Sequence, residues 1–252
     1  MWTGQVLMGR FTPMDLVFDT GSDWLVVESN KCQNCEGNTY DTSMSTQVGD
    51  LQSERVYGSA RLQGMEHKDI VCVRFDVCVN DFEYFAIYNQ TGIKEPIDGI
   101  LGLARNRWFY QSNSIKKDAR GFGPLYFDAL TSKGHIEEQK FSFYFSGQRG
   151  VAYIDFGTPQ ADAMSSEDDI RWINVLDDFF WSAYNQGIGV GSTDPEDTYA
   201  YSPIKKHPDF VVNNAMYTII DTGSSALIVS NYYFEDLIRL IFDKVGDDEY
   251  KF

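Results

Sequence analysis

The feature that most constrains this chain is a short motif that occurs twice. Asp19-Thr20-Gly21-Ser22 follows the apolar pair Val17-Phe18, and Asp221-Thr222-Gly223-Ser224 follows Ile219-Ile220. The copies lie 202 residues apart, which is too far for a solenoid repeat. One copy could be an ordinary turn in which Asp caps the backbone. Two copies in matching contexts have a chance on the order of one in 10⁴ to 10⁵ at average residue frequencies. The pair therefore predicts two homologous halves that share one site.

The composition of the motif fits a particular chemistry. Gly lets the chain turn sharply and lets another backbone approach closely, and the Thr and Ser hydroxyls can fix the orientation of the carboxylate. Two carboxylates that face each other cannot both ionise cheaply, so they share a proton. The ionised one can take a proton from a water that attacks a peptide carbonyl, while the protonated one donates to the developing oxyanion. This chemistry needs no metal and no cofactor.

Composition excludes several other classes of protein. The chain has 252 residues, of which 15% are aromatic, and aromatic residues favour a β-rich fold. The formal net charge is −16, and no basic cluster offsets it, so nucleic acid is not an expected partner. No apolar run approaches the roughly 18 residues that a membrane-spanning helix needs. Residues 1–5 show no signal-peptide pattern.

Most of the chain consists of short strand-like runs separated by Gly, Asn, Asp and Ser. Residues 141–145 alternate cleanly with period two, as a half-buried strand does. Gly58-Ser59 lies between two strand-like runs and predicts the tip of a hairpin. Apolar residues at spacings of three and four predict a helix over residues 231–245, with Ser230 or Asn231 as its N-cap. Asn89-Gln90-Thr91 is one glycosylation acceptor.

The four cysteines form two close pairs, Cys32 with Cys35 and Cys72 with Cys78. Small loops closed by disulfides fit this spacing better than a metal site, because only the first pair has C-x-x-C spacing. A zinc-binding module around Cys32 and Cys35 stays open as an alternative. The histidines are scattered and form neither a triad nor a metal-ligand spacing; they are His67, His135 and His207.

These motifs resemble the pepsin-like (A1) family of aspartic proteases over essentially the whole chain. The resemblance implies that Asp19 and Asp221 are the catalytic pair. It implies supporting roles for the rest of both motifs: Thr20 and Thr222 brace the two turns, Ser22 and Ser224 bond the outer carboxylate oxygens, and Gly21 and Gly223 complete the turns. Tyr57-Gly58-Ser59 resembles the tip of the flap that closes over substrate. Cys32 and Cys35 match the family's small disulfide loop, and residues 98–103 match the buried strand whose glycine packs beside the first turn.

The resemblance implies an all-β, bilobal fold. The N-terminal lobe, with the flap, would cover residues 1–165, and a partial C-terminal lobe would cover residues 166–252. Residues 165–169 are a candidate linker. The expected activity is hydrolysis of internal peptide bonds at acidic pH, with apolar side chains flanking the cut, in a monomer whose partner is a peptide or protein substrate. A secretory, lysosomal or vacuolar location, or an extracellular one, is implied by the family alone.

Three departures from the family pattern qualify this interpretation. The tryptophan that usually bonds the flap tyrosine is replaced by Val26, with Trp24 two residues earlier, so that tether is an open question. Ala60 stands where the flap usually has glycine. No apolar-apolar-Gly strand equivalent to Ile100-Leu101-Gly102 follows the second turn. An incomplete sequence record or a peptide-binding pseudoprotease would explain the third departure. A retroviral-type homodimer is disfavoured, because one chain carries both turns.

Overall fold

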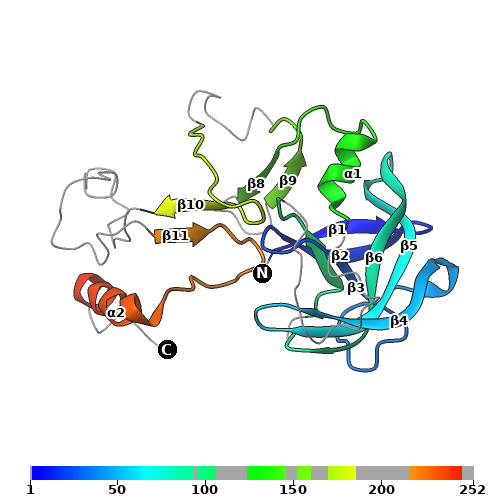
Figure 1. Cartoon of the computed structure of the whole chain (residues 1–252), viewed down its shortest axis with the longest axis horizontal. Coiled ribbons are helices and arrows are strands. Elements are labelled where there is room, and N and C mark those ends of the chain that lie inside the picture. The colour runs from blue at the N-terminus through cyan, green and yellow to red at the C-terminus, as the bar shows by residue number, and fades with distance from the viewer. Residues whose placement is uncertain are drawn as a thin grey trace. The chain divides into compact units, whose positions relative to one another are not determined.

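A computed structural model describes residues 2–93, 96–105, 124–145, 152–159, 170–185 and 216–245. The chain divides into two compact units. The first unit contains residues 1–173, 177–181 and 220–224, and the second contains residues 174–176, 182–219 and 225–252. The predicted lobe boundary and linker lie outside the described residues. Strands dominate the described part of the chain (Figure 1), which confirms the all-β prediction.

The first unit is built on a seven-stranded sheet in the order β1-β2-β7-β3-β6-β5-β4. Its strands are β1 (Thr3–Met8), β2 (Thr12–Asp19), β3 (Leu25–Glu28), β4 (Thr46–Val56), β5 (Arg61–Arg74), β6 (Val77–Thr91) and β7 (Gly99–Gly102). A 3₁₀ turn, η1 (Thr42–Met44), precedes β4. Helix α1 (Tyr126–Ser132) and the hairpin of β8 (Phe141–Phe145) and β9 (Ala152–Phe156) are the other helix and strands described in this unit.

The order of the strands places β7 between β2 and β3. Strand β7 runs parallel to β2, with Asp19 paired to Gly102, and antiparallel to β3, with Leu25 paired to Leu101. The chain therefore leaves β2, turns over the end of β7 and returns as β3 on its other side. The turn between β2 and β3 therefore lies at the end of β7, where Asp19 pairs with Gly102.

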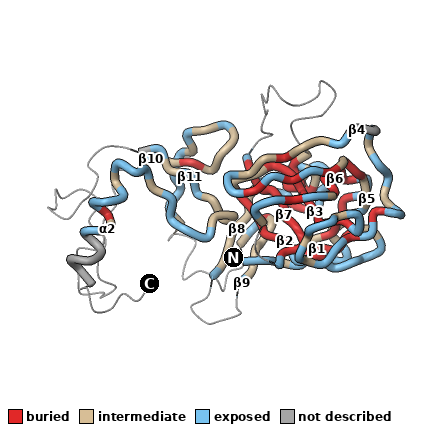
Figure 2. The backbone as a smooth tube through the Cα atoms, turned by 90° about the horizontal axis from the view of Figure 1, so that it is seen from below, coloured by how far each residue is buried: buried red, intermediate tan, exposed pale blue. Residues whose placement is uncertain are grey.

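The hydrophobic core is formed by buried side chains of this sheet together with those of α1. Figure 2 shows buried residues concentrated along β2, β3, β6 and β7. Buried strand residues such as Leu16, Leu25 and Leu101 pack with Tyr126 and Leu130 of α1 in one cluster. A smaller cluster contains Trp24, Val26, Leu62, Phe85 and Ile87, and Tyr57 packs against it. Burial of large apolar side chains is the main favourable term for folding, so this sheet is the rigid base for its loops.

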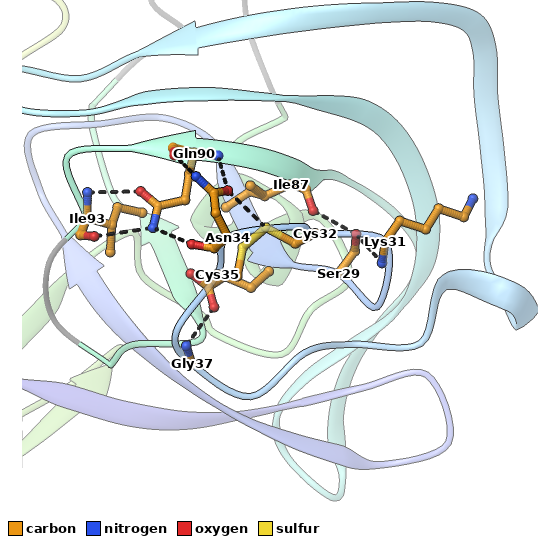
Figure 3. The surroundings of a disulfide bond; sticks show 10 residues. Ser29, Lys31, Cys32, Asn34, Cys35, Gly37, Ile87, Gln90 and Ile93 are labelled. Carbon is orange, nitrogen blue, oxygen red and sulfur yellow. Dashed lines mark hydrogen bonds between the residues drawn. A yellow bond between two sulfur atoms is a disulfide. The ribbon is translucent and has the colours of Figure 1, made fainter.

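Both predicted disulfides are present, Cys32–Cys35 and Cys72–Cys78. The first closes the loop after β3 (Figure 3). Within that loop, Asn34 accepts a hydrogen bond from the Gln90 amide N–H at 3.0 Å, and its own side-chain amide donates to the Gln90 carbonyl. The Gln90 side chain in turn bonds the backbone of Ile93 through both its oxygen and its nitrogen. The disulfide loop is thereby tied to the end of β6.

The described part of the second unit contains a two-stranded ribbon and one helix. Strand β10 (Ser182–Asn185) pairs antiparallel with β11 (Met216–Ile219), and α2 spans Asn231–Val245 as predicted. The Ser230 hydroxyl accepts a hydrogen bond from the Tyr232 amide at 3.3 Å, which makes Ser230 the N-cap. No described helix is long and apolar enough to cross a bilayer.

Candidate active site

The first Asp turn begins where β2 ends. Three buried residues, Leu16 to Phe18, lead to Asp19, which is only 7% exposed. One carboxylate oxygen, Oδ1, accepts a hydrogen bond from the Gly21 amide at 2.8 Å. The other, Oδ2, accepts one from the Ser22 hydroxyl at 2.5 Å. The turn therefore fixes the orientation of its own aspartate.

Strand β7 and the two residues that follow it hold this turn in place. The amide of Leu103 donates to the Asp19 carbonyl at 2.7 Å, and the amide of Ala104 donates to the Ser22 carbonyl at 2.9 Å. Gly102 lies so close that a Cβ added there would be 2.5 Å from the Asp23 carbonyl carbon and 2.6 Å from the Ser22 carbonyl oxygen. Glycine is thus required by the close approach of two backbones.

The second Asp turn makes the same two carboxylate hydrogen bonds as the first. Residues 220–224 belong to the same compact unit as Asp19, although they follow β11 in the chain. The Gly223 amide donates to Asp221 Oδ1 at 2.8 Å, and the Ser224 hydroxyl donates to Asp221 Oδ2 at 2.8 Å. The sequence repeat is therefore also a structural repeat.

Two threonines join the turns through reciprocal hydrogen bonds. The Thr20 hydroxyl donates to the Ile220 carbonyl at 2.7 Å and accepts from the Thr222 amide at 3.0 Å. The Thr222 hydroxyl donates to the Phe18 carbonyl at 2.6 Å and accepts from the Thr20 amide at 3.0 Å. Each hydroxyl uses its single donor and one acceptor site on the opposite turn. The two turns are thus held in a fixed mutual position.

The glycines show how close the two carboxyls come to the opposite turns. A Cβ added to Gly21 would be 2.8 Å from the carboxyl carbon of Asp221. A Cβ added to Gly223 would be 2.6 Å from the carboxyl carbon of Asp19. Each carboxyl therefore occupies space that any larger residue in the opposite motif would need, which explains why glycine stands third in both copies.

Burial and the neighbouring charge change the acidity of Asp19. Burial raises the pKa of this carboxyl to about 7; the Ser22 hydrogen bond opposes the rise, and the charge of Asp221 adds to it. Below that pH Asp19 carries a proton and can donate it. A protonated carboxyl beside a second carboxyl is the arrangement that acid–base chemistry on a bound water requires.

The predicted flap is a hairpin tip between β4 and β5. Gly58 and Ser59 are exposed, and the Tyr57 amide donates to the Ala60 carbonyl at 2.8 Å. Burial raises the pKa of the Tyr57 phenol well above its ordinary value, with the charges of Asp19 and Asp23 adding to the rise. The phenol therefore stays protonated, and it lies within electrostatic reach of the first aspartate.

The hydrogen bond between tryptophan and tyrosine that the family pattern suggests is not made by Trp24. Among the described residues, the Trp24 indole Nε1–H is buried without a hydrogen-bond partner. The face of the indole is used instead: the Arg55 guanidinium carbon lies 4.3 Å from the ring centroid. Sequence reasoning missed Arg55, and the one available signal was a cation two residues before Tyr57 in a strand-like run.

The described residues offer little for a metal. No group of three or more His, Cys, Asp or Glu side chains among them could hold an ion. Cys32 and Cys35 are disulfide-bonded, so the zinc module considered above lacks its thiolates. His67 is buried and bonded to the Ser45 and Tyr88 hydroxyls at 2.8 and 3.1 Å. It is a structural histidine.

Comparisons with known proteins identify the family of the chain. The family model for eukaryotic aspartyl proteases matches residues 3–251. Gastricsin from Oryctolagus cuniculus is 27% identical over 245 residues, covering 94% of this chain and 57% of gastricsin. Pepsin-2B from Gadus morhua is 30% identical over 183 residues, covering 69% and 53% of the two chains. Cathepsin D from Dictyostelium discoideum is 28% identical over 176 residues, covering 66% and 43%. The chain spans about half the length of the curated relatives it matches.

Proposed function

Because the chain belongs to the eukaryotic aspartyl protease family, we propose that it is an aspartic endopeptidase whose Asp19 and Asp221 activate a water for attack on a peptide bond. The observation that supports this most directly is the reciprocal bracing of the two turns by Thr20 and Thr222. That bracing serves no purpose for a chain whose two motifs are independent turns. It does serve a site that needs two carboxyls at one place.

The two aspartates take different roles in this proposal. Asp221, as a carboxylate, removes a proton from the water, whose oxygen forms a bond to the carbonyl carbon. Asp19, whose pKa is about 7, gives its proton to the carbonyl oxygen. The resulting diol collapses when Asp221 returns its proton to the amide nitrogen and the C–N bond breaks. Asp19 then recovers the hydroxyl proton, which leaves an acid, an amine and the starting dyad.

The pH dependence follows from the same pair. The active form holds one proton on the two carboxyls, and this form is lost as the pH rises through about 7, where Asp19 ionises. Activity should also fall at low pH, once the second carboxyl is protonated. We expect a bell-shaped profile on the acidic side of neutrality, and its apparent pKa values will belong to the dyad as a unit.

Cleavage of a quenched-fluorescence peptide with an apolar pair at its centre tests the proposal between pH 3 and pH 8. The wild-type chain should cleave it, and Asp19→Asn and Asp221→Asn should each lose nearly all activity. Asp76→Asn, which alters an exposed carboxylate paired with Arg74, should retain it. A statine-type transition-state mimic should inhibit the wild type. Peptide binding without cleavage would overturn the proposal and support the pseudoprotease instead.

We also propose a secretory route for the protein. Two disulfides close short loops in the first unit, and such bonds persist in oxidising compartments. Free-thiol titration of protein isolated from its native source should find no reduced cysteine. Reduced Cys32 and Cys35 would contradict this assignment.

A further inference from the structure

A buried arginine lies at the base of the flap. Arg55 is the penultimate residue of β4, on the same face as Tyr57 two residues later, and it is only 6% exposed. Its Nη2 donates to the Glu66 carboxylate of β5 at 2.7 Å. Its Nη1 donates to the Ser53 hydroxyl and the Glu54 carbonyl at 3.1 and 3.0 Å. The planar guanidinium is therefore fixed in one orientation by β4 and β5.

This guanidinium also contacts residues outside the flap hairpin. Its central carbon lies 4.3 Å from the Trp24 ring centroid and 4.7 Å from that of Phe85 on β6. Trp24 lies two residues after the first Asp turn, and its carbonyl accepts a hydrogen bond from the Gly102 amide of β7 at 3.0 Å. The charge of Asp23, which directly follows that turn, acts on Arg55 as well. A continuous path of contacts thus runs from the flap base to the catalytic turn.

Stability alone does not account for this arrangement. Burying an ion pair costs desolvation, and well-packed apolar residues of similar volume are often at least as stable. Two N–H groups in the cluster, Arg55 Nε and Trp24 Nε1, are buried without partners among the described residues, which adds a further cost. What the guanidinium provides, and an aliphatic side chain does not, is a flat cation whose orientation is fixed against an aromatic face.

We propose that Arg55 is a positioning residue, which pins the base of the flap hairpin against Trp24 and so sets where Tyr57 stands over the first Asp turn. In this chain the stacked guanidinium takes the place of a hydrogen bond between tryptophan and tyrosine. Glu66 holds the guanidinium in the plane that stacking requires. The effect of Arg55 on substrate binding rests on the proposed protease activity, whereas its effect on the structure of the flap hairpin does not.

Amide hydrogen exchange of the full chain tests the structural part without substrate. Removing Arg55 alone would take the cation away from a buried carboxylate, so the test variant is the double substitution Arg55→Met with Glu66→Leu. We expect the Tyr57 amide, which donates to the Ala60 carbonyl, to exchange at least tenfold faster than in the wild type. Global stability in urea should stay equal or rise. Arg55→Lys keeps the charge but not the planar group, and it should also speed the exchange.

A matched control lies in the same hairpin. Arg61 is exposed and pairs with the Glu54 carboxylate at 3.6 Å, and Arg61→Met should leave the Tyr57 exchange rate unchanged. On the peptide substrate, the double variant should lower kcat/KM about tenfold, chiefly through KM, because a loosened flap holds substrate less well. Unchanged exchange in the double variant would overturn the inference while leaving the protease proposal intact. If the double variant exchanged faster but the wild-type chain had no peptidase activity, the structural role of Arg55 would be supported and the protease proposal would be overturned.

Discussion

At the scale of single residues, the acidity of Asp19 is strongly changed by its surroundings. A carboxyl whose folded-state pKa is about 7, against an ordinary value of 3.8, binds its proton more tightly in the folded than in the unfolded chain. Its contribution to stability is therefore fully present below pH about 4 and is lost as the pH rises to about 7. The buried Asp19 carboxyl is thus a source of instability at neutral pH.

Replacing Asp19 with Asn removes this pH dependence. The amide is neutral at every pH, so the variant avoids the cost of burying a carboxylate above pH 7. We expect the unfolding free energy of Asp19→Asn, relative to the wild type, to rise by on the order of 4 kcal/mol between pH 4 and pH 8. Urea denaturation at the two pH values measures this difference. A difference that does not change with pH would show that Asp19 has an ordinary pKa.

The third residue of each motif gives a second prediction. In Gly21→Ala the new methyl group would stand 2.8 Å from the Asp221 carboxyl carbon, so the two turns must separate. We expect a loss of about 1–3 kcal/mol in unfolding free energy, as for other overpacked sites. The pKa of Asp19 should also fall, because the charge of Asp221 moves away.

Carbon-detected NMR titration of the Asp19 carboxyl, together with urea denaturation, measures both effects. Gly58→Ala is the control for stability, because no atom lies within 4 Å of a Cβ added there. If Gly21→Ala matched the stability of Gly58→Ala and kept the Asp19 pKa near 7, the carboxyls would not be as close as the structure has them.

The residues of the site differ in how far the sequence could predict them. Asp19 and Asp221 were recognisable because a four-residue motif in an apolar context recurred, which needs no knowledge of the fold. Arg55 was not, because its role depends on the ring of Trp24, 31 positions away in the chain, lying under its guanidinium. Stacking leaves no sequence pattern, whereas hydrogen-bonded turns do.

At the scale of elements, the placement of β7 between β2 and β3 decides where the first aspartate points. The sequence indicated a buried strand near residues 98–103 and a glycine beside the turn. It did not give the mixed pairing, parallel to β2 and antiparallel to β3. Pairing across 83 residues, as between Phe18 and Leu101, depends on the sheet as a whole rather than on local periodicity. The hairpins were easier to predict from the sequence, because their strands and turns follow one another directly in the chain.

Gly102→Ala tests the support that β7 gives to the turn. The added methyl group would meet backbone atoms of Ser22 and Asp23 at 2.6 and 2.5 Å, and backbone cannot move aside as a flexible side chain can. We expect β7 to shift, the Leu103 amide to lose its bond to the Asp19 carbonyl, and unfolding free energy to fall by about 1–3 kcal/mol or more. Amide exchange at Leu103 would report the shift, and an unchanged rate would refute it.

At the scale of the whole molecule, the two units differ in how much they bury. In the first unit, most residues of β2, β3 and β7 are buried, whereas Ser182 and Leu237 are the only buried residues among those described in the second (Figure 2). Large apolar side chains there are open to solvent, with Ile228 at 82% and Tyr232 at 81% exposure. Local stability follows the number of buried apolar contacts, so the units should open independently.

This contrast leads to a prediction about the second Asp turn, whose neighbours in the chain belong to the less buried unit. The Ile220 amide donates to the Trp181 carbonyl at 2.8 Å and the Thr222 amide to the Thr20 hydroxyl at 3.0 Å, both within the first unit. The Thr218 amide, by contrast, belongs to the exposed ribbon of the second unit. We therefore expect protection from hydrogen exchange to rise at least tenfold between Thr218 and Thr222.

Amide hydrogen exchange, measured by NMR in the wild type and in Thr20→Val, tests whether the Thr20 hydroxyl causes the protection of Thr222. Valine keeps the shape of threonine but cannot accept the bond from the Thr222 amide or donate to the Ile220 carbonyl. In that variant the protection of Thr222 should fall toward that of Thr218, while amides in the centre of β6 keep their rates. If Thr222 exchanged as fast as Thr218 already in the wild type, the second turn would open with its flanking unit. The carboxyl of Asp221 would then be only transiently in place, and the threonine brace would not hold the dyad together.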